Sequence, residues 1–188
     1  MIHISVVATL AILTYMSTQV QTQIKALEAS GVLVRYMPRS PRKPKRRLFL
    51  CPDAQKDLTD SNSATNLLVG KGFIVGALDR WTLGDRIYGT KRGEFLDRLD
   101  PPPPEVWEIR VTVPDVQARL FGRFAEPDTL ILTKFHTRSM LGNKSSQGWK
   151  QAMNHCDECW NTHFPSIAPF IASSIGAYVT ENCDAYPI

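Results

Sequence analysis

The chain has 188 residues, of which 43% are hydrophobic, and this is enough for one domain of ordinary size with its own core. Four cysteines at irregular spacing exclude a scaffold held together by disulfides and favour a reducing compartment. The formal charge of +4 is modest, but it is distributed unevenly along the chain. We expect a cytoplasmic protein with one domain and appendages at both ends.

An apolar run covers residues 4–16, but it is shorter than the roughly 20 residues that span a bilayer. No Lys or Arg precedes it, as the charged start of a secretory signal would require. We therefore expect no membrane association. Because an ordinary polar sequence follows Met16, one hypothesis places the start of translation at Met16 and not at Met1.

The first half of the chain predicts helices and two short strands. Residues 17–30 have the mixture of polar and apolar side chains of a helix that ends at Gly31. Residues 32–37 and 47–51 are strand candidates, and either can supply the first strand of a sheet. Asp53 can cap a short helix through residue 58. Apolar residues then recur at helical spacing from 64 to 99, which predicts a pair of helices, or a helix and a loop.

A basic segment, residues 35–47, contains no acidic side chain. Its cations are Arg35, Arg39, Arg42, Lys43, Lys45, Arg46 and Arg47. Such a segment favours a polyanion partner, because binding to phosphates releases their counterions. Three prolines within it equally favour a solvated, irregular loop. Both interpretations stay open on the sequence alone.

Three consecutive strands are predicted between residues 106 and 138, because apolar and polar side chains alternate there. In the first strand, Trp107 and Ile109 belong to one face and Glu108 and Arg110 to the other. The side chains expected to share a face in the second strand are Arg119, Phe121 and Arg123, and those in the third are Lys134, His136 and Arg138. Each strand therefore carries cations on one face.

A closing helix is predicted over residues 145–163, with an apolar stripe formed by Trp149, Met153, Cys156 and Trp160. The whole pattern predicts an α+β fold in which a small, twisted, mainly antiparallel sheet packs on helices. We expect an N-terminal extension at residues 1–60, which can supply the first strand, a main domain at 61–165 and a C-terminal tail at 166–188.

The order of these segments resembles the RelE/ParE toxin superfamily, and most of all its HigB-like, phage-associated branch. The resemblance covers residues 64–163 and rests on Trp-Glu-Ile-Arg at 107–110, Arg-Leu-Phe from Arg119, and Phe-His-Thr-Arg at 135–138. It implies a RelE-like domain at 61–165 that acts as a metal-independent endoribonuclease on mRNA, commonly at the ribosome. It also implies an antitoxin partner with a helix-turn-helix domain and no cofactor.

RNA cleavage of this kind needs a group that accepts the proton of the ribose 2′-hydroxyl, a group that protonates the leaving 5′-oxygen, and cations beside the phosphate. The resemblance matches the family's strand arginines to Arg119 and Arg110. His136 can exchange a proton near neutral pH, and Glu108 is a further candidate. These four residues are the predicted catalytic group. The predicted RNA-binding residues are Lys134, Arg138, Arg123, Lys144, Arg46 and Arg47.

The chain departs from the HigB-like pattern where a Lys-Lys pair usually follows the phenylalanine, because Thr137 and Arg138 stand there. A simpler interpretation of the strands is that Glu108 and Arg110 only pair with each other and that His136 is an ordinary surface residue. The alternative function is a noncatalytic, nucleic-acid-binding regulatory protein on the same scaffold.

The sequence also contains a Cys-x-x-Cys motif, Cys156 and Cys159, with His163 one turn later, and these residue types can bind zinc. Both cysteines, however, lie on or beside the apolar stripe of the closing helix, where free cysteines behave as small hydrophobic side chains. We expect core packing here and no bound metal, with a zinc or redox role as the alternatives.

Overall fold

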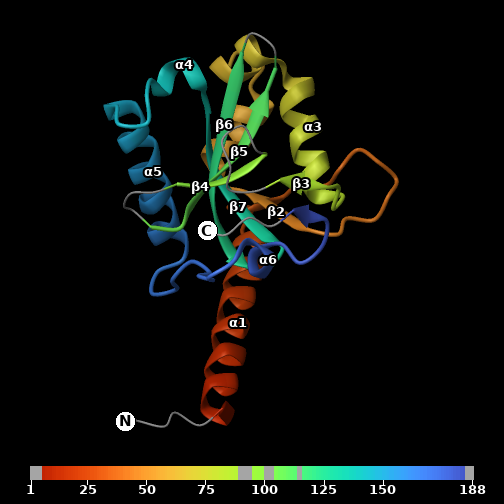
Figure 1. Cartoon of the computed structure of the whole chain (residues 1–188), viewed down its shortest axis with the longest axis vertical. Coiled ribbons are helices and arrows are strands. Elements are labelled where there is room, and N and C mark those ends of the chain that lie inside the picture. The colour runs from red at the N-terminus through yellow and green to blue at the C-terminus, as the bar shows by residue number, and fades with distance from the viewer. Residues whose placement is uncertain (1–5, 89–94, 100–103, 114–115, 185–188) are drawn as a thin grey trace.

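The computed structural model describes residues 6–88, 95–99, 104–113 and 116–184 (Figure 1). Its helices are α1 (Val6–Ala29), α2 (Pro52–Thr59), the π-helix η1 (Asn66–Gly70), α3 (Lys71–Thr82), α4 (Arg138–Leu141), α5 (Gln147–His163) and α6 (Ile175–Tyr178). Its strands are β1 (Val34–Arg35), β2 (Arg47–Leu50), β3 (Ile87–Tyr88), β4 (Leu96–Leu99), β5 (Val106–Thr112), β6 (Gln117–Glu126), β7 (Thr129–Thr137) and β8 (Cys183–Asp184).

The helices predicted over residues 17–30, 53–58 and 145–163 are confirmed as α1, α2 and α5, and α1 begins earlier than predicted, at Val6. Pro52 begins α2, where its missing N–H is not needed. Ser146 caps α5, because its hydroxyl accepts a hydrogen bond from the Trp149 N–H at 3.4 Å. Within the described ranges, no helix has both the length and the apolar character needed to cross a membrane.

The helical prediction for residues 64–99 is partly wrong. Its first part forms η1 and α3, but Leu96–Leu99 forms β4, and residues 89–94 lie outside the described residues. β4 pairs with β5, with Leu96 opposite Ile109, so pairing within the sheet overrides the helical spacing of the sequence. The third predicted strand also ends earlier than expected. β7 stops at Thr137, and Arg138 begins α4.

Six strands form one sheet in the order β1-β2-β7-β6-β5-β4, and β3 pairs with β8 separately. β2 runs parallel to β7, whereas the other neighbouring strands of the large sheet are antiparallel. The protein is therefore a mixed α+β protein with an open, mostly antiparallel sheet, as the sequence predicts at this coarse level. The N-terminal region supplies β1 and β2 to this sheet.

Helices cover the sheet from two sides, with α3 and α5 on opposite sides of it in Figure 1. The face toward α3 holds the main core, which includes Trp81, Trp107, Phe124 and Tyr178. The face toward α5 holds two smaller clusters. One joins α1 and α5 over β2 and β7 through Val20, Ile24, Phe49, Ile131, Trp160 and Phe164, and the other joins α5 to β6 through Phe121, Trp149, Met153 and Cys156.

A bulge in β7 decides which of its side chains face α5. Phe121 pairs with Lys134 but Gly122 pairs with Leu132, so Thr133 is the extra residue. The buried Thr133 hydroxyl donates to the Phe121 carbonyl at 3.2 Å. At Gly122 the strands approach so closely that a Cβ would lie 2.3 Å from the Ile131 oxygen. After the bulge, the even-numbered residues of β7 share the face of Phe121.

Candidate functional site

Three of the four predicted catalytic residues are neighbours in the sheet. Arg110 on β5 pairs with Arg119 on β6, and Arg119 pairs with His136 on β7. Side chains of directly opposed residues project from the same face of a sheet. The sheet therefore brings Arg110, Arg119 and His136 together as a row across three strands, which we call the three-strand row.

Acidic side chains neutralise much of this row. Glu108 Oε1 accepts from Arg110 Nε at 2.6 Å, and its Oε2 lies 3.4 Å from Arg119 Nε. Arg110 also forms an ion pair with Asp97 on β4. Glu108 is fully buried, and Arg110 and Arg119 are each 8% exposed. Burial raises the pKa of the Glu108 carboxyl, and the two guanidinium groups act against that rise.

His136 completes the row as a neutral base. Its ring packs edge-on against Phe121, with the ring centroids 5.5 Å apart. Burial lowers the pKa of His136 to about 4, and the positive charges of Lys134 and His155 lower it further in the same direction. Its buried Nε2 has no hydrogen-bond partner among the described residues. A neutral imidazole next to Arg119, with Arg110 one strand further along the row, can accept a proton while the guanidinium groups stabilise an anion.

The four predicted RNA-binding residues on β6, on β7 and beyond it all have partners within the protein. Lys134 lies 3.6 Å from Asp53 and 3.8 Å from Asp57 on α2, and the exposed Lys144 lies 3.3 Å from Asp97. The guanidinium of Arg138 stands over the Trp149 ring, 5.4 Å from its centroid. Arg123 is buried, pairs with Asp157 at 2.8 Å and donates to the Pro104 carbonyl at 3.0 Å.

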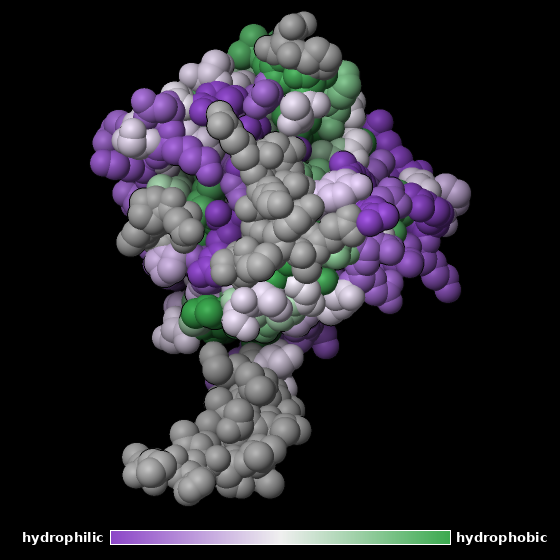
Figure 2. All heavy atoms as spheres, in the orientation of Figure 1, coloured by the Kyte–Doolittle hydropathy of each residue, from purple (hydrophilic) through white to green (hydrophobic). Residues whose placement is uncertain are grey.

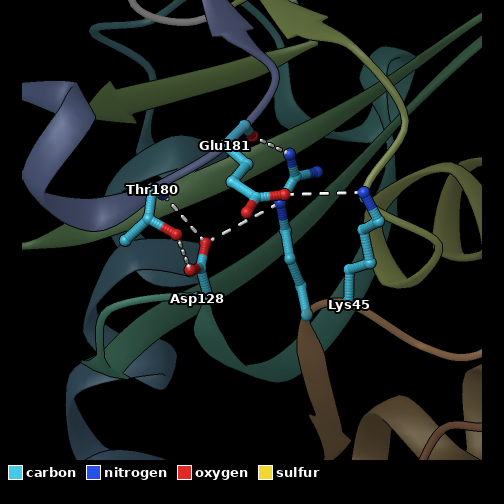
Figure 3. A pocket seen from close by; sticks show the side chains of 6 residues that line it. Lys45, Asp128, Thr180 and Glu181 are labelled. Atoms are coloured by element: carbon cyan, nitrogen blue, oxygen red, sulfur yellow. Dashed lines mark hydrogen bonds and ion pairs between the residues drawn. The ribbon is translucent and has the colours of Figure 1, made fainter.

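Arg46 and Arg47 are also held by intramolecular contacts. Arg46 is 2% exposed, lies 5.3 Å from the Trp81 ring centroid and pairs with Asp128 at 3.7 Å, beside a cavity of about 280 Å³ (Figure 3). Lys45 at the same cavity pairs with Glu181 at 3.5 Å, so the cavity carries balanced charges. Arg47 pairs with Glu126 and donates to Thr129 Oγ1 at 3.0 Å.

The exposed positive charge lies instead in the loop of the basic segment. The loop extends from the body to the right of the sheet in Figure 1, and the same place is hydrophilic in Figure 2. Arg39 and Lys43 are exposed there, and Arg35 is exposed at the end of β1, where the loop begins; none of the three has an ion pair with any described residue. Arg42 pairs with Asp85 at 3.0 Å. Three cations of the basic segment are therefore accessible to an anionic partner.

The cysteines separate into two environments. Cys156 is fully buried between α5 and the sheet, and burial raises its pKa to about 12, so the prediction of core packing is confirmed for this residue. Cys159 is half-buried on the neighbouring side of α5, close to Cys51 and His163. No pattern in the sequence places Cys51 in this group or Asp97 beside Arg110. For Cys51, the available signal is its position immediately before the proline that begins α2.

Compared with known proteins, the chain matches no family model, no curated protein and no solved structure. Its function is therefore inferred from the geometry of its own residues.

Proposed function

We propose that the protein is a metal-independent endoribonuclease that cuts mRNA, the toxin of a type II toxin–antitoxin system with a RelE-like, HigB-like domain. The observation that carries the proposal is the three-strand row, in which two arginines and a neutral histidine are adjacent on one face of the sheet. The mixed α+β fold with a mostly antiparallel sheet supports it at a coarser level.

In the proposed reaction, His136 accepts the proton of the ribose 2′-hydroxyl, and the 2′-oxygen forms a bond to the adjacent phosphorus. Arg110 and Arg119 stabilise the added charge on the phosphate oxygens. The bond from phosphorus to the 5′-oxygen breaks, which leaves a cyclic phosphate and a 5′-hydroxyl. Glu108 orients the two arginines through its ion pairs, and the leaving oxygen takes its proton from a water molecule.

Induced expression of the full chain tests this proposal. We expect growth arrest with new 5′-hydroxyl ends in cellular mRNA, and we expect Arg119→Lys and His136→Gln to relieve both effects. Lys43→Gln, which changes an exposed cation outside the row, is the matched control and should remain toxic. Circular dichroism of each purified variant confirms that it is folded. If the folded wild type leaves growth and RNA intact, the enzyme proposal is lost.

The proposed partners follow from the same function. They are mRNA, cut either free or at the ribosome, and a small helix-turn-helix antitoxin that blocks the toxin in the cytoplasm. Co-expression with the product of a short neighbouring open reading frame should restore growth. Copurification of the two chains at a fixed stoichiometry would show that they form a complex.

A noncatalytic RNA-binding protein is the second candidate, and one observation favours it. Glu108 and Asp97 neutralise the two arginines of the row, whereas the cations of the basic loop are exposed. Such a protein would bind RNA without cleaving it, and salt would weaken the binding. Replacing Arg35, Arg39 and Lys43 with Gln should reduce the slope of log affinity against log salt by about 2. Unchanged affinity and slope would exclude this loop as the binding surface.

A further inference from the structure

Two thiols and an imidazole meet where the start of α2 approaches the last turn of α5. The sulfurs of Cys51 and Cys159 and a ring nitrogen of His163 all lie within 4.8 Å of one another. None of these side chains belongs to the three-strand row. The group therefore has no part in the proposed function and requires its own explanation.

The fold holds each member of this group on a regular element. Cys51 follows β2 directly and is the N-cap of α2, and its N–H donates to the Leu132 carbonyl at 2.9 Å. Cys159 and His163 are four residues apart on α5, so their side chains lie on the same side of the helix. Cys51 is buried, whereas Cys159 and His163 are half-buried. One side of the group is thus closed by protein and the other is accessible.

The accessible side opens into a cavity of about 310 Å³. Cys159 and His163 line it, together with Pro52, Asp53, His155, Glu158 and Thr162. Asp53 and His155 pair with each other at 3.1 Å on its wall. The cavity gives small ions access to the two half-buried members of the group.

We propose that Cys51, Cys159 and His163 bind one zinc ion, or a divalent cation of the same borderline-soft class, with the fourth coordination position facing this cavity. Two sulfurs and one imidazole nitrogen are a zinc ligand set, and three protein ligands with an open position are the arrangement that leaves room for water or a further ligand. On binding, the two thiols release their protons and the histidine coordinates as the neutral base.

The distances fit this ligand set. A tetrahedral zinc ion holds sulfur and nitrogen ligands roughly 3.5 to 3.8 Å apart, so no distance within the observed group has to shorten by more than about 1.3 Å.

Core packing explains Cys156 completely, but it explains this group only in part. Cys51 belongs to the apolar cluster between α1 and α5 and Cys159 packs against it, whereas His163 belongs to no apolar cluster of the described residues. Cys156 is enclosed by Phe121, Trp149 and Met153, as expected for a cysteine that acts as a small hydrophobic side chain. Cys159 and His163 also line a cavity together with the polar side chains of Asp53, His155 and Glu158. A disulfide between Cys51 and Cys159 would use both sulfurs and leave the histidine without a role. The metal site uses all three side chains.

Cobalt titration of the full chain tests the site. The protein is purified without a histidine tag, reduced, freed of metal with a chelator and titrated with Co²⁺. We expect a sulfur-to-cobalt charge-transfer band that saturates at one ion per chain and disappears when Zn²⁺ is added. Cys159→Ser and His163→Ala should each lose tight zinc binding, and Cys159→Ser should weaken the charge-transfer band. Cys183→Ser, a half-exposed cysteine in β8, is the matched control and should behave as wild type.

Two results would overturn the site. The first is a reduced, folded wild type that gives no charge-transfer band and binds no stoichiometric zinc. The second is a zinc stoichiometry and affinity that Cys159→Ser leaves unchanged. If air oxidation converts Cys51 and Cys159 to a disulfide in a protein that binds no metal when reduced, the pair is a redox element. Toxicity and RNA cleavage are not readouts here, so failure of the proposed function leaves this test intact.

Discussion

Glu108 is the side chain on which the charge balance of the sheet depends. Its carboxylate is fully buried between Arg110 and Arg119, and each of these arginines is also largely buried. A buried charge that loses its partner is costly, because neither water nor an opposite charge then compensates it. The three charges therefore depend on one another for their place in the protein interior.

Replacing Glu108 with Gln tests this dependence. The amide keeps the shape of the side chain but removes the negative charge, so we expect the free energy of unfolding to fall by about 3 kcal/mol. Urea unfolding at neutral pH measures it. Lys144→Met removes an exposed lysine from its pair with the buried Asp97, which keeps its ion pair with Arg110, so this change should cost no more than about 1 kcal/mol. Equal stability of the two variants would show that the Glu108 carboxylate is dispensable.

His136 makes stability depend on pH. Its folded-state pKa is about 4, below the ordinary value of 6.5, so protons bind the unfolded chain more readily. The neutral form of His136 therefore contributes to the free energy of unfolding, and this contribution is complete above pH 6.5 and is lost as the pH falls through 4. Its size is on the order of 3 kcal/mol. Urea unfolding of the wild type and His136→Gln between pH 7 and 4 measures it. Between pH 7 and 4 the wild type should lose up to about 3 kcal/mol of stability relative to the variant, and parallel curves would contradict the shift.

At the scale of elements, the alternation of apolar and polar residues predicts which side chains share a face of the sheet, but it does not predict which residues they contact. The sequence correctly separates Glu108 and Arg110 from Trp107 and Ile109, because these residues alternate within one strand. The sequence predicts a helix or a loop for residues 96–99, since Phe95 and Leu99 have helical spacing, and it therefore does not place Asp97 in the site. Cys51 was missed for a related reason. Its approach to Cys159 depends on how α2 and α5 pack on the sheet, which no local pattern encodes.

The bulge at Thr133 is the element-scale feature that places His136 beside Arg119. It requires the close approach at Gly122, where any side chain meets the Ile131 carbonyl. We expect Gly122→Ala to lower the free energy of unfolding by about 2 kcal/mol or more, because the backbone of β7 must move to make room for the methyl group. Gly76→Ala, at an exposed helical position with open space, should raise it by about 0.5 to 1 kcal/mol. The urea unfolding midpoints of the two variants measure these changes. If Gly122→Ala leaves the midpoint unchanged, the strands can separate at this position.

At the scale of the whole molecule, both ends of the chain help to cover the sheet. Val20 and Ile24 of α1 pack with α5 on one face. On the other face, Ile175, Tyr178 and Val179 belong to the same cluster as Trp107 and Phe124. The tail that follows residue 165 is therefore part of the main core. We infer that the sheet and the tail unfold together.

Tyr178 is the residue that tests this coupling. Its ring is fully buried, 4.6 Å from the Trp107 centroid and 5.0 Å from that of Phe124, and its hydroxyl donates to Glu105 at 2.6 Å. Tyr178→Ala should cost about 4 kcal/mol, because it leaves a cavity among these rings, whereas Tyr178→Phe should cost about 1 kcal/mol through the lost hydrogen bond. Tryptophan fluorescence and far-ultraviolet circular dichroism should give coincident urea transitions for all three proteins. An early transition seen by one probe alone would mean that the tail detaches before the sheet unfolds.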